Sequence, residues 1–273
     1  MKTVFAGFVM AMATGAVWAA GPDISVVRQA PVQGGFLVAK VPAGSNVKLD
    51  GKPISVGPDG QIVVGFDREA KGAAVLNVCD AQNACAKKTV KIGARVFKTQ
   101  NVTGIPPKTV DPDPAQVART EADSKATQDA RNKANEAAKW RSAFMDGFKL
   151  PVEAPTSGVY GSRRTYNGQE RSWHKGHDLA AKTGTPVKAP ADGIVRLARD
   201  TFMSGNLIML DHGGALTTVY AHLNSMDVKV GDSVKAGDVI GTVGTTGRSS
   251  GPHLHWGAYW KNTAIDPILW VAK

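Results

Sequence analysis

The stretch Gly251-Pro-His-Leu-His-Trp256 places two histidines on either side of a leucine, inside an otherwise apolar run. On a β-strand, side chains two residues apart point to the same face. We therefore expect Leu254 to face a core, while His253 and His255 face one cleft. Alone, such a pair is only a weak indication of a site, so the residues around it have to support it.

The other histidines strengthen this indication, because none of the six lies in the first 173 residues. They are His174, His177, His212, His222, His253 and His255. Histidine is the commonest side-chain metal ligand and a frequent acid–base group. His174 and Asp178 are four residues apart, which is one face of a strand or of a helix, and the surroundings favour a strand. Two histidines and one aspartate suit zinc with an open fourth position.

Short apolar stretches separated by turn residues predict a mainly β protein with antiparallel sheets. Asp50-Gly51 is a strong hairpin signal between two of these stretches. The expected strands are residues 36–41, 47–49, 52–54, 61–64, 73–78, 89–92, 191–197, 206–210, 215–220 and 239–243.

The composition divides the chain into four parts. Residues 1–19 are predicted to be a signal peptide cleaved after Ala19. An uncut membrane anchor is the alternative, but the apolar run is shorter than the roughly 20 residues that span a bilayer. We expect no stable membrane span after cleavage. Residues 20–98 are expected to form a small β module, 99–148 a Pro-rich connector and a long helix, and 149–273 the C-terminal domain.

Residues 115–148 are rich in Ala, Lys, Glu, Asp, Arg and Gln and contain no proline, which favours a helix. Apolar positions are sparse until Ala138, Trp140 and Phe144. We therefore expect one long, mostly solvated helix that docks only at its C-terminal end. A partly disordered linker is the alternative.

The net charge of +10 is compatible with nucleic acid, an anionic membrane surface or an acidic polymer as partner. The absence of a basic block and of any nucleic-acid-binding motif argues against nucleic acid. Cys79 and Cys85 are the only cysteines. In an exported protein we expect them to form a disulfide that joins two neighbouring strands, and no other Cys or His lies near enough in sequence to suggest a metal site.

Three segments together resemble the lysostaphin-type, LytM-like zinc endopeptidases: His174-Lys-Gly-His-Asp178, Tyr220-Ala-His-Leu223 and Gly251-Pro-His-Leu-His-Trp256. Gly161-Ser-Arg-Arg and residues 231–247 support the resemblance, which covers about 150–270. The upstream part is similar, much less specifically, to exported Gram-negative members. The resemblance implies a C-terminal antiparallel β-sheet peptidase domain of the duplicated hybrid motif type.

Transferred residue by residue, the resemblance makes His174, Asp178 and His255 the ligands of one Zn²⁺ per chain, and His222 and His253 catalytic. Zinc lowers the pKa of bound water to about 7. A neutral imidazole can orient or deprotonate that water, and a protonated one can stabilise the oxyanion. The sequence leaves open which histidine has which role.

The resemblance therefore implies an exported, periplasmic zinc endopeptidase that hydrolyses peptide cross-links of peptidoglycan. The alternative is a non-enzymatic LytM-like adaptor that activates other wall hydrolases. Such adaptors lack metal ligands, whereas all three ligands and both catalytic histidines are present here. A lipoyl- or biotin-carrier half-barrel over residues 231–247 would need an exposed lysine in a hairpin turn, and Lys235 lacks that setting.

Several further residues have ordinary structural interpretations. His212 is expected at a turn, and His177 is expected to face away from the proposed ligands. Trp256 and Trp260 are expected to pack in a core.

Some polar residues leave two interpretations open. Arg163 and Asn167 either border a substrate groove or make loop hydrogen bonds. Residues 245–250 form either a groove wall or a solvated loop, and Arg248 there could meet a substrate carboxylate. A further hypothesis is that the helix and the β module shield the groove.

Overall fold

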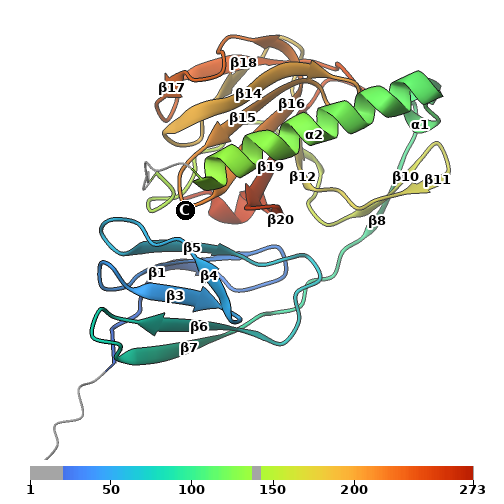
Figure 1. Ribbon diagram of the computed structural model, residues 1–273. Helices are drawn as coiled ribbons and strands as arrows, with labels where there is room; N and C mark the ends of the chain where they lie inside the picture. Colours follow the sequence, from blue (N-terminus) through green and yellow to red (C-terminus); the bar gives the residue numbers. More distant parts are fainter. Residues whose placement is uncertain (1–20, 137–142, 273) are drawn as a thin grey trace, which may run out of the picture.

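The computed structural model describes residues 21–136 and 143–272. The predicted signal peptide, residues 1–19, lies outside these ranges, as do Ala138 and Trp140. The described chain is mainly β, with antiparallel sheets and one long helix, as predicted (Figure 1). No helix in the described ranges is long and apolar enough to cross a membrane.

Two small sheets form the first part of the described chain. One has the order β1-β2-β5 and the other β4-β3-β6-β7. Asp50 and Gly51 have φ angles of 47° and 80°, which gives the expected tight hairpin between β3 and β4. A disulfide joins Cys79 to Cys85 and links β6 to β7, as predicted. The strands are β1 (Ser25–Ala30), β2 (Phe36–Lys40), β3 (Asn46–Leu49), β4 (Lys52–Ile54), β5 (Gln61–Gly65), β6 (Ala73–Cys79) and β7 (Cys85–Lys91).

The C-terminal part is built on a ten-stranded sheet with the main order β17-β14-β15-β16-β19-β12-β9. Strand β18 pairs with β13 and β16, and β20 pairs with β19. The strands are β9 (Thr156–Gly158), β12 (Gly176–Leu179), β13 (Pro186–Lys188), β14 (Gly193–Thr201), β15 (Gly205–Asp211), β16 (Leu216–Met226), β17 (Ser233–Val234), β18 (Val239–Val243), β19 (Leu254–Trp260) and β20 (Thr263–Ile265), followed by the 3-10 helix η1 (Pro267–Trp270).

A three-stranded sheet and two helices connect the two parts. Strand β8 (Thr99–Val102) pairs in parallel with β10 (Arg163–Tyr166), which pairs with β11 (Gln169–Arg171). The short helix α1 (Pro107–Val110) and the long helix α2 (Pro114–Glu136) follow β8. In Figure 1, α2 lies across the ten-stranded sheet, above the two small sheets.

One apolar core joins the small sheets to the C-terminal sheet. The rings of Phe36 and Trp270 stack with their centroids 3.9 Å apart. A Cβ on Gly65 would lie 2.7 Å from the Cβ of Trp260, so these backbones pack at close range. Trp256 is completely buried and Trp260 nearly so, which confirms their predicted place in a core.

The opposite face of the C-terminal sheet is covered by α2, and this explains why the first eight residues of β16 are all buried. A second apolar cluster forms there from Ala130 of the helix and five sheet residues, Leu197, Leu207, Met209, Val219 and Ala221. A strand that is covered on both faces does not show the alternation of apolar and polar residues that is typical of a half-exposed strand.

The prediction that the helix docks only at its C-terminal end is wrong. Asp123, in the middle of α2, is buried, accepts a hydrogen bond from the backbone N of Phe202 at 2.8 Å and lies 3.1 Å from Arg199. The helix docks through alanines and a buried carboxylate, so the apolar spacing could not indicate its buried face. Phe144 is buried as expected, but it lies beyond the end of α2.

Replacing Asp123 by Ala should loosen the helix, because the N–H of Phe202 and the guanidinium of Arg199 would lose a buried acceptor. An unpaired buried donor costs about 1–3 kcal/mol. We expect amide hydrogen exchange over residues 114–136 to accelerate by at least tenfold. Asp129→Ala is the matched control, since its pair with Lys125 is exposed. Equal exchange in the two variants would show that Asp123 does not hold the helix.

Candidate metal centre

The pairing of β12 with β19 brings the predicted ligands together. In this antiparallel register Asp178 lies directly opposite His255. His174 precedes β12 rather than lying on it, so the expectation that His174 and Asp178 share one strand face is wrong in detail. Instead, the backbone N of His174 donates to Ser162 O, and its carbonyl accepts from Gly161 N, both at 2.8 Å. These bonds fix His174 beside the strand pair.

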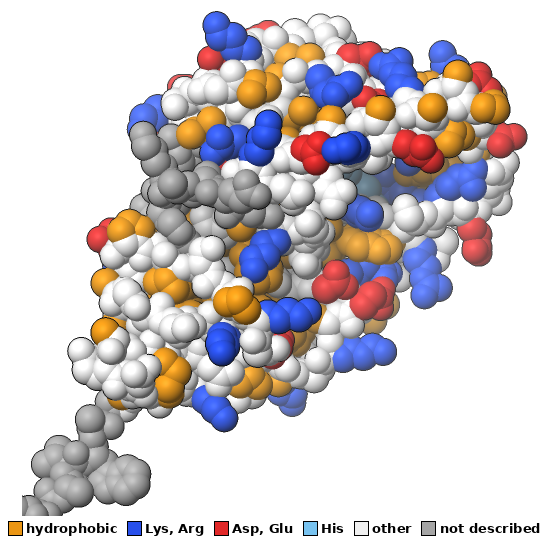
Figure 2. All heavy atoms as spheres, viewed as in Figure 1, with side chains coloured by type: hydrophobic (Ala, Val, Ile, Leu, Met, Phe, Trp, Pro, Cys, Tyr) orange, Lys and Arg blue, Asp and Glu red, His pale blue; other side chains and the backbone are white. Residues whose placement is uncertain are grey.

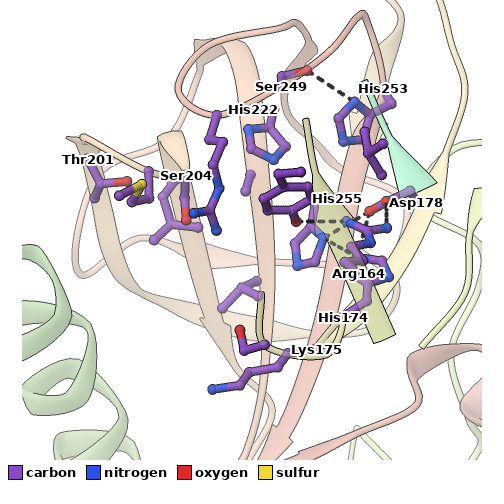
Figure 3. Close-up of a pocket in the computed structure, with 18 of the residues that line it drawn as sticks. Arg164, His174, Lys175, Asp178, Thr201, Ser204, His222, Ser249, His253 and His255 are labelled. Atoms are coloured by element: carbon purple, nitrogen blue, oxygen red, sulfur yellow. Dashed lines mark hydrogen bonds and ion pairs between the residues drawn. The ribbon is translucent and has the colours of Figure 1, made fainter. Parts of the chain in front are cut away.

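Three donor atoms form a compact triangle at this point (Figure 3). His174 Nε2, His255 Nδ1 and Asp178 Oδ1 lie 2.9 Å from one another along all three sides. His174 and Asp178 are each 5% exposed. Three lone-pair atoms at this spacing, out of water, repel one another unless a proton or a cation lies between them.

The donor set fits zinc. The Nδ1 of His174 lies 3.0 Å from the carbonyl of Val159. Since a carbonyl only accepts, Nδ1 carries the proton and Nε2 presents its lone pair to the triangle. Two imidazole nitrogens and one carboxylate oxygen leave a fourth position of a tetrahedral site open, as in catalytic zinc sites. His174, Asp178 and His255 are the residues that would hold the ion.

Arg164, on β10, holds the outer oxygen of the same carboxylate. Its Nη2 lies 2.5 Å from Asp178 Oδ2, and both side chains are buried. Gly158 makes room for this pair, because a Cβ there would lie 2.3 Å from Oδ2 and 2.4 Å from Nη2. Arg164 was not predicted as a site residue, because no spacing pattern in the sequence relates it to Asp178. Its effect is to leave only Oδ1 of Asp178 facing the triangle.

The charges of the ligands follow from burial and from their mutual contacts. Burial raises the pKa of Asp178, but its close polar contacts with the two imidazoles outweigh burial and hold that pKa well below its usual range. Burial lowers the pKa of His255, although Asp178 opposes the shift. The carboxylate is therefore ionised, and the His255 imidazole favours its neutral, ligating form.

His222 reaches the same site because β16 is irregular. Between the pairs Asn206–Leu223 and Ile208–Tyr220, strand β16 contains one residue more than β15. His222 also has a φ angle of 63°, in the left-handed region that non-glycine residues rarely occupy. In a regular strand Ala221 and His222 would point to opposite faces, whereas here both line one groove. The bulge thus re-aims the imidazole.

His222 and His253 lie together next to the triangle, with ring centroids 4.8 Å apart. His222 Nδ1 lies 2.8 Å from the carbonyl of Thr246, and His253 Nδ1 lies 2.8 Å from that of Gly251. Each Nδ1 is therefore the donor, so Nε2 is the ring nitrogen that remains available in each histidine. Burial, with His253 and His255 nearby, lowers the pKa of His222 to about 3. His222 is accordingly neutral at pH 7.

These residues line a groove of about 790 Å³. Helix α2 forms one wall through Asp123, Arg131 and neighbouring residues, and residues 248–253 form another. No residue before Gln100 lines it, so within the described chain the helix borders the groove and the small sheets do not. Figure 2 shows it as a hollow with a histidine visible inside and basic side chains near its rim.

The remaining histidines are structural. His212 is completely buried, with Nδ1 2.8 Å from the carbonyl of Asp192 and Nε2 2.8 Å from Thr218 Oγ1. His177 points away from the groove, and its Nε2 lies 2.9 Å from Thr156 Oγ1. Both agree with the roles expected from the sequence.

Two open alternatives from the sequence are decided by the geometry. Arg163 is exposed and does not line the groove. Asn167 donates to the carbonyl of Ile105 at 2.8 Å and accepts from its N–H, which is loop hydrogen bonding. In contrast, Arg248, Ser249 and Ser250 do line the groove.

Comparison with known proteins places this site in a family context. Residues 172–267 match the model of peptidase family M23. DD-carboxypeptidase/endopeptidase Mpg of Neisseria meningitidis serogroup B is 43% identical over 95 residues, covering 35% of this chain and 22% of that protein. Peptidoglycan DD-endopeptidase ShyC of Vibrio cholerae is 43% identical over 83 residues, covering 30% and 19%. The chain thus spans about a fifth of the length of these curated relatives.

A solved structure matches over nearly the whole chain. It is the crystal structure of a Pseudomonas aeruginosa protein described as a candidate M23 peptidase. The TM-score is 0.68 at 28% sequence identity, and the match covers 90% of this chain and 97% of that one. The likeness therefore includes the small sheets and the helix as well as the C-terminal sheet.

Replacing Gly176 by Ala should disturb the triangle. A Cβ there would lie 2.6 Å from His255 Cε1 and 2.6 Å from the carbonyl oxygen of Trp256, so the ring or the strand has to move. We expect the zinc Kd, measured by competition with a chelating dye, to rise at least tenfold. Gly251→Ala is the control, because nothing lies within 4 Å of a Cβ at that position. A Kd for Gly176→Ala equal to that of the wild type would contradict this geometry.

Because His212 is buried, we expect the free energy of unfolding to depend on pH. Burial lowers its pKa in the folded state, against a hydrogen bond to Asp192 that raises it. Below its ordinary pKa of about 6.5, the unfolded chain therefore binds a proton that the folded chain excludes. The free energy of unfolding should fall with decreasing pH, by up to about 1.4 kcal/mol per pH unit from this group.

The difference between wild type and His212→Gln isolates this effect. Denaturant unfolding of both metal-free proteins from pH 8 to pH 5 should show the variant less stable at pH 8 but with a shallower decline. The other histidines titrate in both proteins and cancel in the difference. Parallel curves would contradict the assignment.

Proposed function

Because residues 172–267 belong to peptidase family M23, we propose that the chain is a zinc-dependent endopeptidase that hydrolyses peptide cross-links of bacterial peptidoglycan. The observation that carries the proposal is the convergence of three donor atoms, 2.9 Å apart, beside two imidazoles with free Nε2 atoms. The named activities of Mpg and ShyC support the substrate class.

In this proposal His174, Asp178 and His255 hold the metal, and His222 and His253 are catalytic. Zinc supplies Lewis acidity toward the scissile carbonyl and toward water. His222 is neutral at pH 7, and its Nε2 accepts a hydrogen bond from the attacking water. The paired imidazole of His253 is close enough to share the proton and to donate to the developing oxyanion. Thr246 and Gly251 keep both rings in the required tautomer.

The adaptor alternative is not favoured, because an adaptor has no use for an ionised carboxylate buried between two imidazoles. Arg164 pairs with Oδ2 of Asp178, but Oδ1 faces the two ligand nitrogens, and this arrangement fits a second cation bound among the three atoms. We also propose that the protein is exported and acts in the periplasm, since its substrate lies there. Residues 1–19 would supply the export signal.

Two histidine variants test the proposal on purified sacculi, with released muropeptides identified by mass spectrometry. His255→Ala should lose the roughly one zinc bound per chain and all activity. His222→Ala should keep the zinc and lose at least about a hundredfold in rate, as expected for a general acid–base group. His212→Gln, assayed at pH 7, is the matched control and should retain both zinc and activity. Undiminished activity in both site variants would rule out the assignment.

A further inference from the structure

The groove contains positive charge that the protein does not neutralise. Four basic side chains line it: Arg131, Arg164, Lys175 and Arg248. Arg164 is paired with Asp178, and the other acidic lining residue, Asp123, is engaged by Arg199. Of the side chains that the structure describes, no carboxylate lies within ion-pair distance of the remaining three. Lys175 is exposed, but the two arginines are half-buried.

Arg248 is close in the chain to the residues that hold the proposed catalytic histidines. It belongs to the loop whose Thr246 carbonyl holds His222 and whose Ser249 Oγ lies 3.3 Å from His253 Nδ1. Its backbone N donates to Met203 O at 2.8 Å, which ties the loop to the far side of the groove. The guanidinium lies over the ring of Tyr166, 4.8 Å from the centroid. This contact restrains the guanidinium, and no residue in the described ranges accepts a hydrogen bond from it.

Arg131 repeats this arrangement further along the groove. It comes from α2, and its guanidinium lies 4.2 Å from the ring centroid of Tyr259. Its Nε is buried and has no hydrogen-bond partner among the residues that the structure describes. Tyr259 is four residues beyond His255 on β19, and at about 3.3 Å per residue this is about 13 Å along the strand. The two arginines thus lie at different positions along the groove.

We propose that the groove binds an acidic peptide, in which Arg248 pairs with a free carboxylate next to the bond that is cut and Arg131 pairs with a second carboxylate further along. The inference rests on the proposed function and narrows its substrate to cross-links whose residues keep free carboxylates. A guanidinium presents two parallel N–H donors that match a carboxylate, so it discriminates well against a neutral amide. Helix α2, which lies outside the segment matched to the family, then forms part of the substrate site.

The test compares two synthetic cross-linked stem-peptide dimers that differ only in their carboxylates, free in one and converted to carboxamides in the other. The zinc-loaded wild-type protein should show a kcat/KM at least tenfold higher for the free-acid dimer, which corresponds to about 1.4 kcal/mol. Arg248→Gln and Arg131→Gln should each lower kcat/KM for the free-acid dimer about tenfold and leave the carboxamide dimer unchanged. Both variants should bind zinc like the wild type.

Arg163→Gln is the matched control, since Arg163 is an exposed arginine outside the groove, and it should keep the full preference. Equal kcat/KM for both dimers in the wild type, or variants that slow both dimers equally, would overturn the inference and leave the endopeptidase function intact. If neither dimer is cut, the proposed function fails. In that case, calorimetric Kd values for the two dimers test the carboxylate site separately. A tenfold lower Kd for the free-acid dimer supports the site, and equal Kd values overturn it.

Discussion

The convergence of three metal-donor atoms is the constraint on which the surrounding structure depends. Separated by 2.9 Å, they can stay together only if the backbone supplies what side-chain electrostatics does not. The β12–β19 register fixes Asp178 against His255, and two backbone hydrogen bonds fix His174 beside them. A site held by paired strands and by backbone hydrogen bonds is preorganised for its cation.

The parts of the chain before residue 150 meet this site from two directions. Behind it, Arg68 of the small sheets donates to the carbonyl of Gly161 at 2.8 Å, and the N–H of Gly161 is bonded to His174. The small sheets thus support the segment that carries a proposed ligand. In front of it, helix α2 borders the groove. The same N-terminal region therefore supports the site on one side and borders its groove on the other.

The sequence predicted those features that depend on local periodicity. The alternation around Leu254 and the Asp50-Gly51 turn are local, and the structure has both. Three features depend on contacts that periodicity does not record. They are the bulge at His222, the Arg164–Asp178 pair admitted by Gly158, and the docked face of α2. The helix shows the reason clearly: alanines and Asp123 bury a face without any of the large apolar residues that would mark it.

Structural arginines and the arginines of the groove differ in the groups that their guanidinium contacts. Arg196 and Arg199 each pair with a buried aspartate, so their donors are occupied. Arg131 and Arg248 instead lie on tyrosine rings, which restrain a guanidinium without using its hydrogen-bond donors. A neighbouring carboxylate would have given the folded chain more stability, but it would also compete with any anionic ligand. An aromatic support partly offsets the cost of burying the cation and leaves its recognition surface open, which is the arrangement expected of a preorganised binding group.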